Sequence, residues 1–184
     1  MFRKELLIIS TKMETFSVIG SANTRLVTQV RTRVILIIIG LVFSGFTAFP
    51  IEWELNYAHE WVAAWKQHTA FSRWIELVFR GVHNTNFAYP FIAYGSDWLG
   101  FAHLVIAIAF LGPLKDPVRN RWVIEFGIIS CFLIFPFAFL AGHIRQIPIF
   151  WRLIDCSFGL VGGVILWDCL LKIKTLEKNK LSGV

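Results

Sequence analysis

The residues best suited to chemistry are histidines and aspartates that stand within or beside long apolar stretches. Ionisable side chains are costly in such surroundings, and in membrane helices they mark functional sites. Two histidines and one carboxylate bind zinc or iron and leave a coordination position open for water. His103, His143 and Asp155 would form such a metal set, with Asp97 as the alternative carboxylate. Asp97, His103 and Asp155 are also our candidates for catalytic acid–base groups.

Spacing argues against the metal set. Asp97 and His103 lie six residues apart, which in a helix separates them by ~120° around the axis and ~9 Å along it, so one ion would not readily contact both. The sequence has no HExxH, HxxxH or CxxC motif. Haem would need His103 and His143 as facing axial ligands, and their different depths disfavour it. The segment between the first two apolar stretches adds further ligand candidates, namely His59, Glu60 and His83.

The same polar residues also have a structural interpretation, which we favour. Arg152 and Asp155 are three residues apart and could neutralise each other on one helix face. Ser96 or Asp97 could cap a helix N-terminus, and His103 could donate a hydrogen bond to a carbonyl of a neighbouring helix. Both interpretations concern one ligand-binding or structural polar cluster, which comprises Ser96, Asp97, His103, His143, Arg152 and Asp155.

Four apolar stretches must position these side chains. Hydrophobic residues make up 56% of the 184 residues, and the mean hydropathy is +0.62. Each stretch approaches the ~20 residues with which a helix crosses a membrane. The sequence therefore predicts an all-α integral membrane bundle of four transmembrane helices, with amphipathic interfacial helices between spans one and two. The expected spans are about 34–50, 94–114, 122–142 and 152–172.

The basic residues indicate how this bundle is oriented. Thirteen of the 18 Lys and Arg residues lie before residue 34, in 115–121 or in 172–180. Because cytoplasmic segments of membrane proteins are enriched in these residues, we expect both termini in the cytoplasm, as an N-terminal tail 1–33 and a C-terminal tail 174–184. The net charge of +6 is split among these segments instead of forming one patch, which argues against nucleic acid as a partner.

The outward segment between spans one and two is rich in aromatic residues. Trp53, Tyr57, Trp61 and Trp65 recur every fourth residue, which predicts a helix with one aromatic face. A second helix is expected at about 72–82. Amphipathic helices of this kind lie in the membrane interface, so interfacial helices at about 52–82 would cover the outward ends of the spans.

Two acids inside the spans have simpler explanations than catalysis. Glu125 lies four residues after Arg121, and Asp168 lies four residues before Lys172. Residues at this spacing are neighbours on a helix surface and form ion pairs. We therefore expect both acids to be paired locally.

Three short runs resemble small, uncharacterised polytopic membrane proteins of bacteria. They read YGSDW at 94–98, DPVRNRW at 116–122 and WRLIDCSFG at 151–159. The resemblance covers roughly the second half of the chain. It implies a location in the bacterial inner (plasma) membrane and no particular activity.

The function expected from these observations is that of a multi-pass inner-membrane protein. It would bind a lipid or small apolar ligand beneath the outward aromatic layer. One alternative is a membrane enzyme with a metal or acid–base site in the outward third of the bundle. Another is a small transporter or an accessory subunit of a membrane complex. The lipid bilayer is the expected partner, and other membrane subunits or further copies of the chain remain open.

Overall fold

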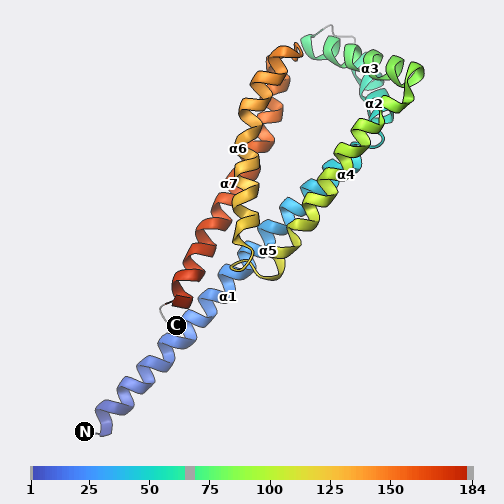
Figure 1. Ribbon diagram of the computed structural model, residues 1–184. Helices are drawn as coiled ribbons and strands as arrows, with labels where there is room; N and C mark the ends of the chain where they lie inside the picture. The colour runs from blue at the N-terminus through green and yellow to red at the C-terminus, as the bar shows by residue number, and fades with distance from the viewer. Residues whose placement is uncertain (1, 65–68, 182–184) are drawn as a thin grey trace. The chain divides into compact units, whose positions relative to one another are not determined.

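The computed structural model describes residues 2–64 and 69–181, with side chains from residue 20 onward. These residues form helices joined by short turns, and no strand occurs among them. The chain divides into two compact units, one of Ile38–Ala109 and one of Met1–Ile37 with Phe110–Val184. In order, the elements are α1 (Phe2–Thr47), α2 (Ile51–Ala64), α3 (Ala70–Ala88), η1 (Pro90–Ile92), α4 (Tyr94–Ala109), α5 (Leu111–Lys115), α6 (Arg121–Ile144) and α7 (Ile149–Leu181) (Figure 1).

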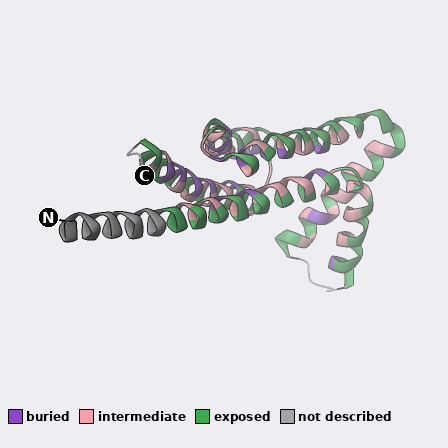
Figure 2. Ribbon diagram, turned by 90° about the horizontal axis from the view of Figure 1, so that it is seen from below, coloured by how far each residue is buried: buried purple, intermediate pink, exposed green. Residues whose placement is uncertain are grey.

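Four helical segments are long and apolar enough to cross a membrane. They are Gly20–Thr47, Pro90–Lys115, Arg121–Ile144 and Ile149–Leu181. An all-helical fold with four helices of spanning length was expected from the apolar stretches and is confirmed. Most side chains on these helices are exposed or only partly covered, and Figure 2 shows buried residues confined to the sides where helices meet.

The helices extend beyond the expected spans. Helix α1 is continuous from Phe2, and α7 continues to Leu181, so helix also occupies described parts of the expected tails 1–33 and 174–184. The sequence contains no proline between these limits of α1 or α7, and its Lys, Glu and Leu residues favour helix. Hydropathy marks only the apolar part of a helix, so a helix can continue past the span that hydropathy predicts.

The unit of residues 1–37 and 110–184 is organised by α6 and α7, which lie side by side (Figure 1). Glycines allow this close packing. A Cβ at Gly127 would lie 2.7 Å from a methyl carbon of Leu166, and one at Gly159 would lie 2.8 Å from the carbonyl oxygen of Cys131. Side chains with 2% exposure or less form the core of this unit, and they are those of Val30, Val34, Phe110, Pro113, Val123, Ile124, Leu166, Cys169 and Ile173.

A tight turn joins α6 to α7. The Ile147 N–H donates to the Gly142 carbonyl at 2.8 Å, and the Gln146 N–H donates to the His143 carbonyl at 3.1 Å. This pair of bonds is the Schellman motif that closes helix C-termini. Gln146 occupies its left-handed position, with φ of 56°, where glycine is usually found.

In the unit of residues 38–109, the end of α1 packs against α4 through two glycines. A Cβ at Gly45 would lie 2.9 Å from the Gly100 carbonyl oxygen, and one at Gly100 would lie 2.7 Å from that of Gly45. Helices α2 and α3 form a hairpin in the same unit. Thr69 caps α3, because its hydroxyl oxygen accepts from the Ser72 N–H at 3.1 Å.

Candidate functional site

The predicted polar cluster is divided between the two units. Ser96, Asp97 and His103 belong to α4, whereas His143, Arg152 and Asp155 belong to α6 and α7. Throughout the part of the chain that the structure describes, no group of three or more His, Cys, Asp and Glu side chains is arranged to hold a metal ion. The set of His103, His143 and Asp155 therefore stays a prediction from the sequence.

Two polar residues of α4, Ser96 and His103, bond to backbone carbonyls three or four residues earlier in the chain. Helix α4 begins at Tyr94, so Ser96 and Asp97 lie in its first turn, and neither occupies the expected N-cap. The Ser96 hydroxyl donates to the Ala93 carbonyl at 2.7 Å. The Nδ1 atom of His103 bonds to the Leu99 carbonyl oxygen at 2.8 Å. The acceptor of His103 was expected on a neighbouring span, and it lies instead one turn earlier, where a helix offers the nearest carbonyl.

Arg152 also finds a nearer partner than the one expected. Its Nε donates to the Ile147 carbonyl at 2.7 Å, and its alkyl chain crosses Gly142, where an added Cβ would lie 2.9 Å from Cδ of Arg152. Arg152 thus braces the turn between α6 and α7. The ion pairs among the described residues do not include one between Arg152 and Asp155, so that expected pair is wrong.

In the α2–α3 hairpin, two histidines contact two glutamates, and these contacts were not predicted from the sequence. Glu52 accepts from Asn86 at 2.8 Å and contacts Nδ1 of His83 at 2.9 Å. Asn86 and His83 lower the pKa of Glu52 below its ordinary value of 4.5. These contacts join the first turn of α2 to the last turns of α3.

A second carboxylate joins the two helices about two turns further along α2. Glu76 pairs with His59 of α2 and with Arg80 of α3, and Arg80 is the main reason that the pKa of Glu76 is lowered. The ring of Phe79 stacks on His59 at 4.5 Å and on His83 at 5.7 Å between centroids. Together these residues form the histidine–glutamate clasp, comprising Glu52, His59, Glu76, Phe79, Arg80, His83 and Asn86.

One sequence signal could have indicated the clasp. Glu76 and Arg80, like Phe79 and His83, are four residues apart on one face of α3. His59 and His83, two of the candidate metal ligands, each have a glutamate partner in the structure. Glu60, the third of those candidates, accepts a hydrogen bond from Asn56 at 3.3 Å on the exposed side of α2.

The aromatic face of α2 points away from α3. Trp53, Tyr57 and Trp61 are 62%, 54% and 55% exposed, whereas Val62 of α2 and Ile75 of α3 are buried. Trp65, the last residue of the expected stripe, lies outside the described residues. The hairpin therefore has an exposed aromatic face and a separate face on which its two helices meet.

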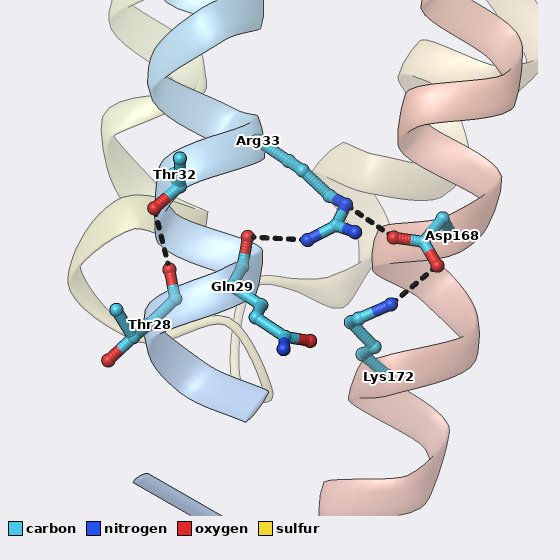
Figure 3. Close-up of polar contacts among 6 residues, drawn as sticks. All are labelled: Thr28, Gln29, Thr32, Arg33, Asp168 and Lys172. Atoms are coloured by element: carbon cyan, nitrogen blue, oxygen red, sulfur yellow. Dashed lines mark hydrogen bonds and ion pairs between the residues drawn. The ribbon is translucent and has the colours of Figure 1, made fainter. Parts of the chain in front are cut away.

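In the unit of residues 1–37 and 110–184, ion pairs link the helices at the end where the basic residues gather. Asp168 of α7 pairs with Lys172 one turn later and with Arg33 of α1 (Figure 3). Arg121 pairs with Glu125 at 2.7 Å and with Glu177 of α7 at 2.9 Å. The two expected local pairs are confirmed. The partners on other helices, Arg33 and Glu177, were missed because spacing along the sequence reports only local neighbours.

The DPVRNRW run has a structural role at the same end. Asp116 accepts from the Arg119 N–H at 3.0 Å, and Asn120 donates to the Gly112 and Asp116 carbonyls, both at 3.0 Å. Arg31 of α1 donates to the carbonyls of Leu114 and Lys115 at 3.0 and 3.1 Å. Carbonyls at the end of a helix need such partners, so Asn120 of this run closes α5, and Arg31 ties α5 to α1.

An open apolar groove of about 450 Å³ runs along α6 and α7. It owes its depth partly to Gly163, where a Cβ would find its nearest neighbour at 3.6 Å and space beyond it. Asp168 contributes the one carboxylate of its lining. Its lining consists of Ile128, Cys131, Phe132, Phe135, Gly159, Leu160, Gly163, Val164, Trp167, Asp168 and Leu171. Gly159 packs closely against α6, whereas Gly163, four residues later on α7, opens the groove.

Comparison of the chain with protein-family models, with curated proteins and with solved structures finds no match. The structure offers two candidate sites, each within one unit. They are the apolar groove that includes Asp168 and the histidine–glutamate clasp of the α2–α3 hairpin.

Proposed function

We propose that this protein is a multi-pass component of a bacterial inner membrane with both termini in the cytoplasm. Support comes from the four apolar helices and from the distribution of basic residues between them. Arg31, Arg33, Arg121 and Lys172, which this topology assigns to the cytoplasmic side, also make their contacts at one end of a single unit. The α2–α3 hairpin would lie at the outer surface, with its aromatic face at headgroup depth.

Within that membrane, we propose that the protein holds a lipid or similar apolar ligand in the groove between α6 and α7. The observation that carries this proposal is the groove itself, whose volume of about 450 Å³ falls in the range of small-molecule sites. Its lining is almost wholly apolar, and two sides of it are formed by packed helices. Only residues of α6 and α7 line the groove, so this proposed ligand site replaces the one that the sequence predicts beneath the outward aromatic layer.

Two valines on α7 provide a matched test. Val164 lines the groove, whereas Val161 does not, and both are well exposed at 63% and 59%. Val164→Trp would fill the groove with an indole ring, and Val161→Trp would add the same bulk beside it. Native mass spectrometry of the full chain, released from mild detergent, then counts retained lipids.

We expect one retained lipid on the unmodified protein and on Val161→Trp, and none on Val164→Trp. A purified protein that retains no lipid, or a Val164→Trp variant that retains as much as Val161→Trp, would refute lipid binding in this groove. The melting temperatures of both variants confirm that they fold.

A further inference from the structure

The groove ends at a cluster of charges that does not neutralise itself. Asp168 lines the groove, and its carboxylate lies between the guanidinium of Arg33 and the ammonium group of Lys172 (Figure 3). Two cations against one carboxylate leave a net positive charge at this end. A long apolar groove with a positive charge at one end complements a membrane molecule that has an apolar chain and an anionic head.

We propose that the groove binds an anionic phospholipid, with an acyl chain along α6 and α7 and the headgroup phosphate at Arg33 and Lys172. This inference rests on the proposed function and names the class of its ligand. Arginine binds phosphate oxygens with its fork of N–H groups, and lysine binds them as a compact charge. Basic pockets between helices on the cytoplasmic side bind anionic headgroups in this manner.

The two cations have donors to offer. Nη1 of Arg33 donates to the Gln29 carbonyl at 3.2 Å, its Nε faces Asp168, and Nζ of Lys172 faces the same carboxylate. Guanidinium and ammonium groups carry more N–H bonds than these contacts use. A phosphate could therefore be bound while Asp168 keeps the two cations in place.

The direction of the groove fits a lipid in the membrane. From Asp168 the lining continues back along α7 to Gly159, a rise of roughly 14 Å in a helix. In the proposed topology this path leads from the cytoplasmic headgroup region toward the middle of the bilayer. An acyl chain bound there follows the direction of its neighbours in the bilayer.

Charge selects among phospholipids. A zwitterionic headgroup carries its own cation, which Arg33 and Lys172 would repel, whereas phosphatidylglycerol brings only negative charge. Because basic residues near the membrane surface attract anionic lipid, the net positive charge of this cluster predicts a preference of about tenfold.

The test measures which lipid the full-length protein retains from mixed bilayers. The protein is placed in nanodiscs of equal phosphatidylglycerol and phosphatidylcholine, released into detergent, and weighed by native mass spectrometry. We expect phosphatidylglycerol to be retained about tenfold over phosphatidylcholine. Arg33→Gln combined with Lys172→Gln should abolish that preference. Lys174→Gln removes one charge from an exposed position on the same helix and should preserve it.

Asp168→Asn separates ligand binding from structure. The substitution removes the negative charge between the cations, so phosphatidylglycerol retention should rise. A purely structural role of the three residues predicts the opposite, because the variant would loosen α1 from α7 and lose lipid. Inorganic phosphate alone should leave the melting temperature unchanged, since the acyl chain supplies the contact with the groove.

The outcomes distinguish this inference from the proposed function. Lipid retained without headgroup preference, or a preference that survives in the double variant, overturns the anionic headgroup site and leaves an apolar ligand in the groove. Loss of all lipid from the unmodified protein overturns both. A dimer whose formation Val164→Trp prevents would show that a second copy occupies the groove, and would also overturn both.

Discussion

The guanidinium group of Arg33 on α1 pairs with the carboxylate of Asp168 on α7, so that one ion pair links the first and last helices of the chain. Lys172 contacts the same carboxylate from one turn further along α7. The pair lies beside the core formed by Val30, Val34 and Cys169, each with 0% exposure. Packing and charge therefore hold α1 and α7 together at the same level.

A double-mutant cycle should show that Arg33 and Asp168 are coupled. Arg33→Gln and Asp168→Asn each remove one partner, and their combined effect should fall short of the sum by about 1 kcal/mol, because both side chains are partly exposed. Denaturation in mixed micelles measures the free energy of unfolding. Additive effects would mean that the two charges do not interact in the folded protein.

Glycine is required where α1 meets α4. Gly45→Ala or Gly100→Ala would place a methyl group within 3 Å of a backbone carbonyl oxygen on the opposite helix, so each should lower the free energy of unfolding by about 1–3 kcal/mol. Gly40→Ala is the matched control on α1, since a Cβ there has no neighbour within 4 Å. Thermal denaturation compares the variants, and equal melting temperatures for Gly40→Ala and Gly45→Ala would contradict the packing described.

The pairing of α2 with α3 should weaken in acid. The pKa values of Glu52 and Glu76 are lowered below 4.5 in the folded protein, so the folded state favours the charged carboxylates. Their contribution is complete above the ordinary pKa and is lost as the pH falls through the lowered folded values. Hydrogen exchange of α2 and α3, measured as a function of pH and corrected for intrinsic rates, should show loss of protection below about pH 4.5.

Two substitutions control this experiment. Glu52→Gln combined with Glu76→Gln should reduce protection at neutral pH and remove much of its acid dependence. Glu60→Gln changes an acid on the exposed side of α2 and should leave the profile unchanged. Identical profiles for the unmodified protein and the Glu52/Glu76 double variant would show that the clasp contributes nothing to pairing.

A glycine at position 146 should stabilise the protein. Gln146 has φ of 56° at the end of α6, a conformation that is unfavourable for residues with a Cβ by roughly 1 kcal/mol. Gln146→Gly should therefore raise the free energy of unfolding by about that amount, while Gln146→Ala should not. Equal stability of the glycine and alanine variants would indicate that this turn is unstrained.

The apolar pattern predicted where the helices lie in the sequence better than it predicted which helices contact one another. The four helices of spanning length follow from long apolar stretches, and the Arg121–Glu125 and Asp168–Lys172 pairs follow from helical spacing. Spacing could not indicate that Arg33 and Glu177 join these pairs from other helices. An apolar side chain can pack against lipid as favourably as against another helix, so hydropathy alone does not specify which helices meet.

The candidate sites were predicted less completely. His103 was identified as a polar residue inside a span, but its Leu99 acceptor depends on local geometry. The histidines of the clasp were named without their glutamate partners, because those partners come from opposite helices of the hairpin. The groove depends on Gly163 being open while Gly159 is packed. The sequence shows two glycines four residues apart on one helix face, and nothing in it distinguishes the open one from the packed one.

The most direct test of the account is the topology on which the lipid site depends. Single cysteines at Lys115, Gln146 and Lys180, in a chain with Cys131, Cys156 and Cys169 replaced by alanine, would be labelled in intact cells with a membrane-impermeant maleimide. We predict labelling at position 146 alone, with positions 115 and 180 reactive only after the membrane is opened. Labelling of position 115 or 180 in intact cells, or protection of position 146, would contradict four passages with both ends in the cytoplasm.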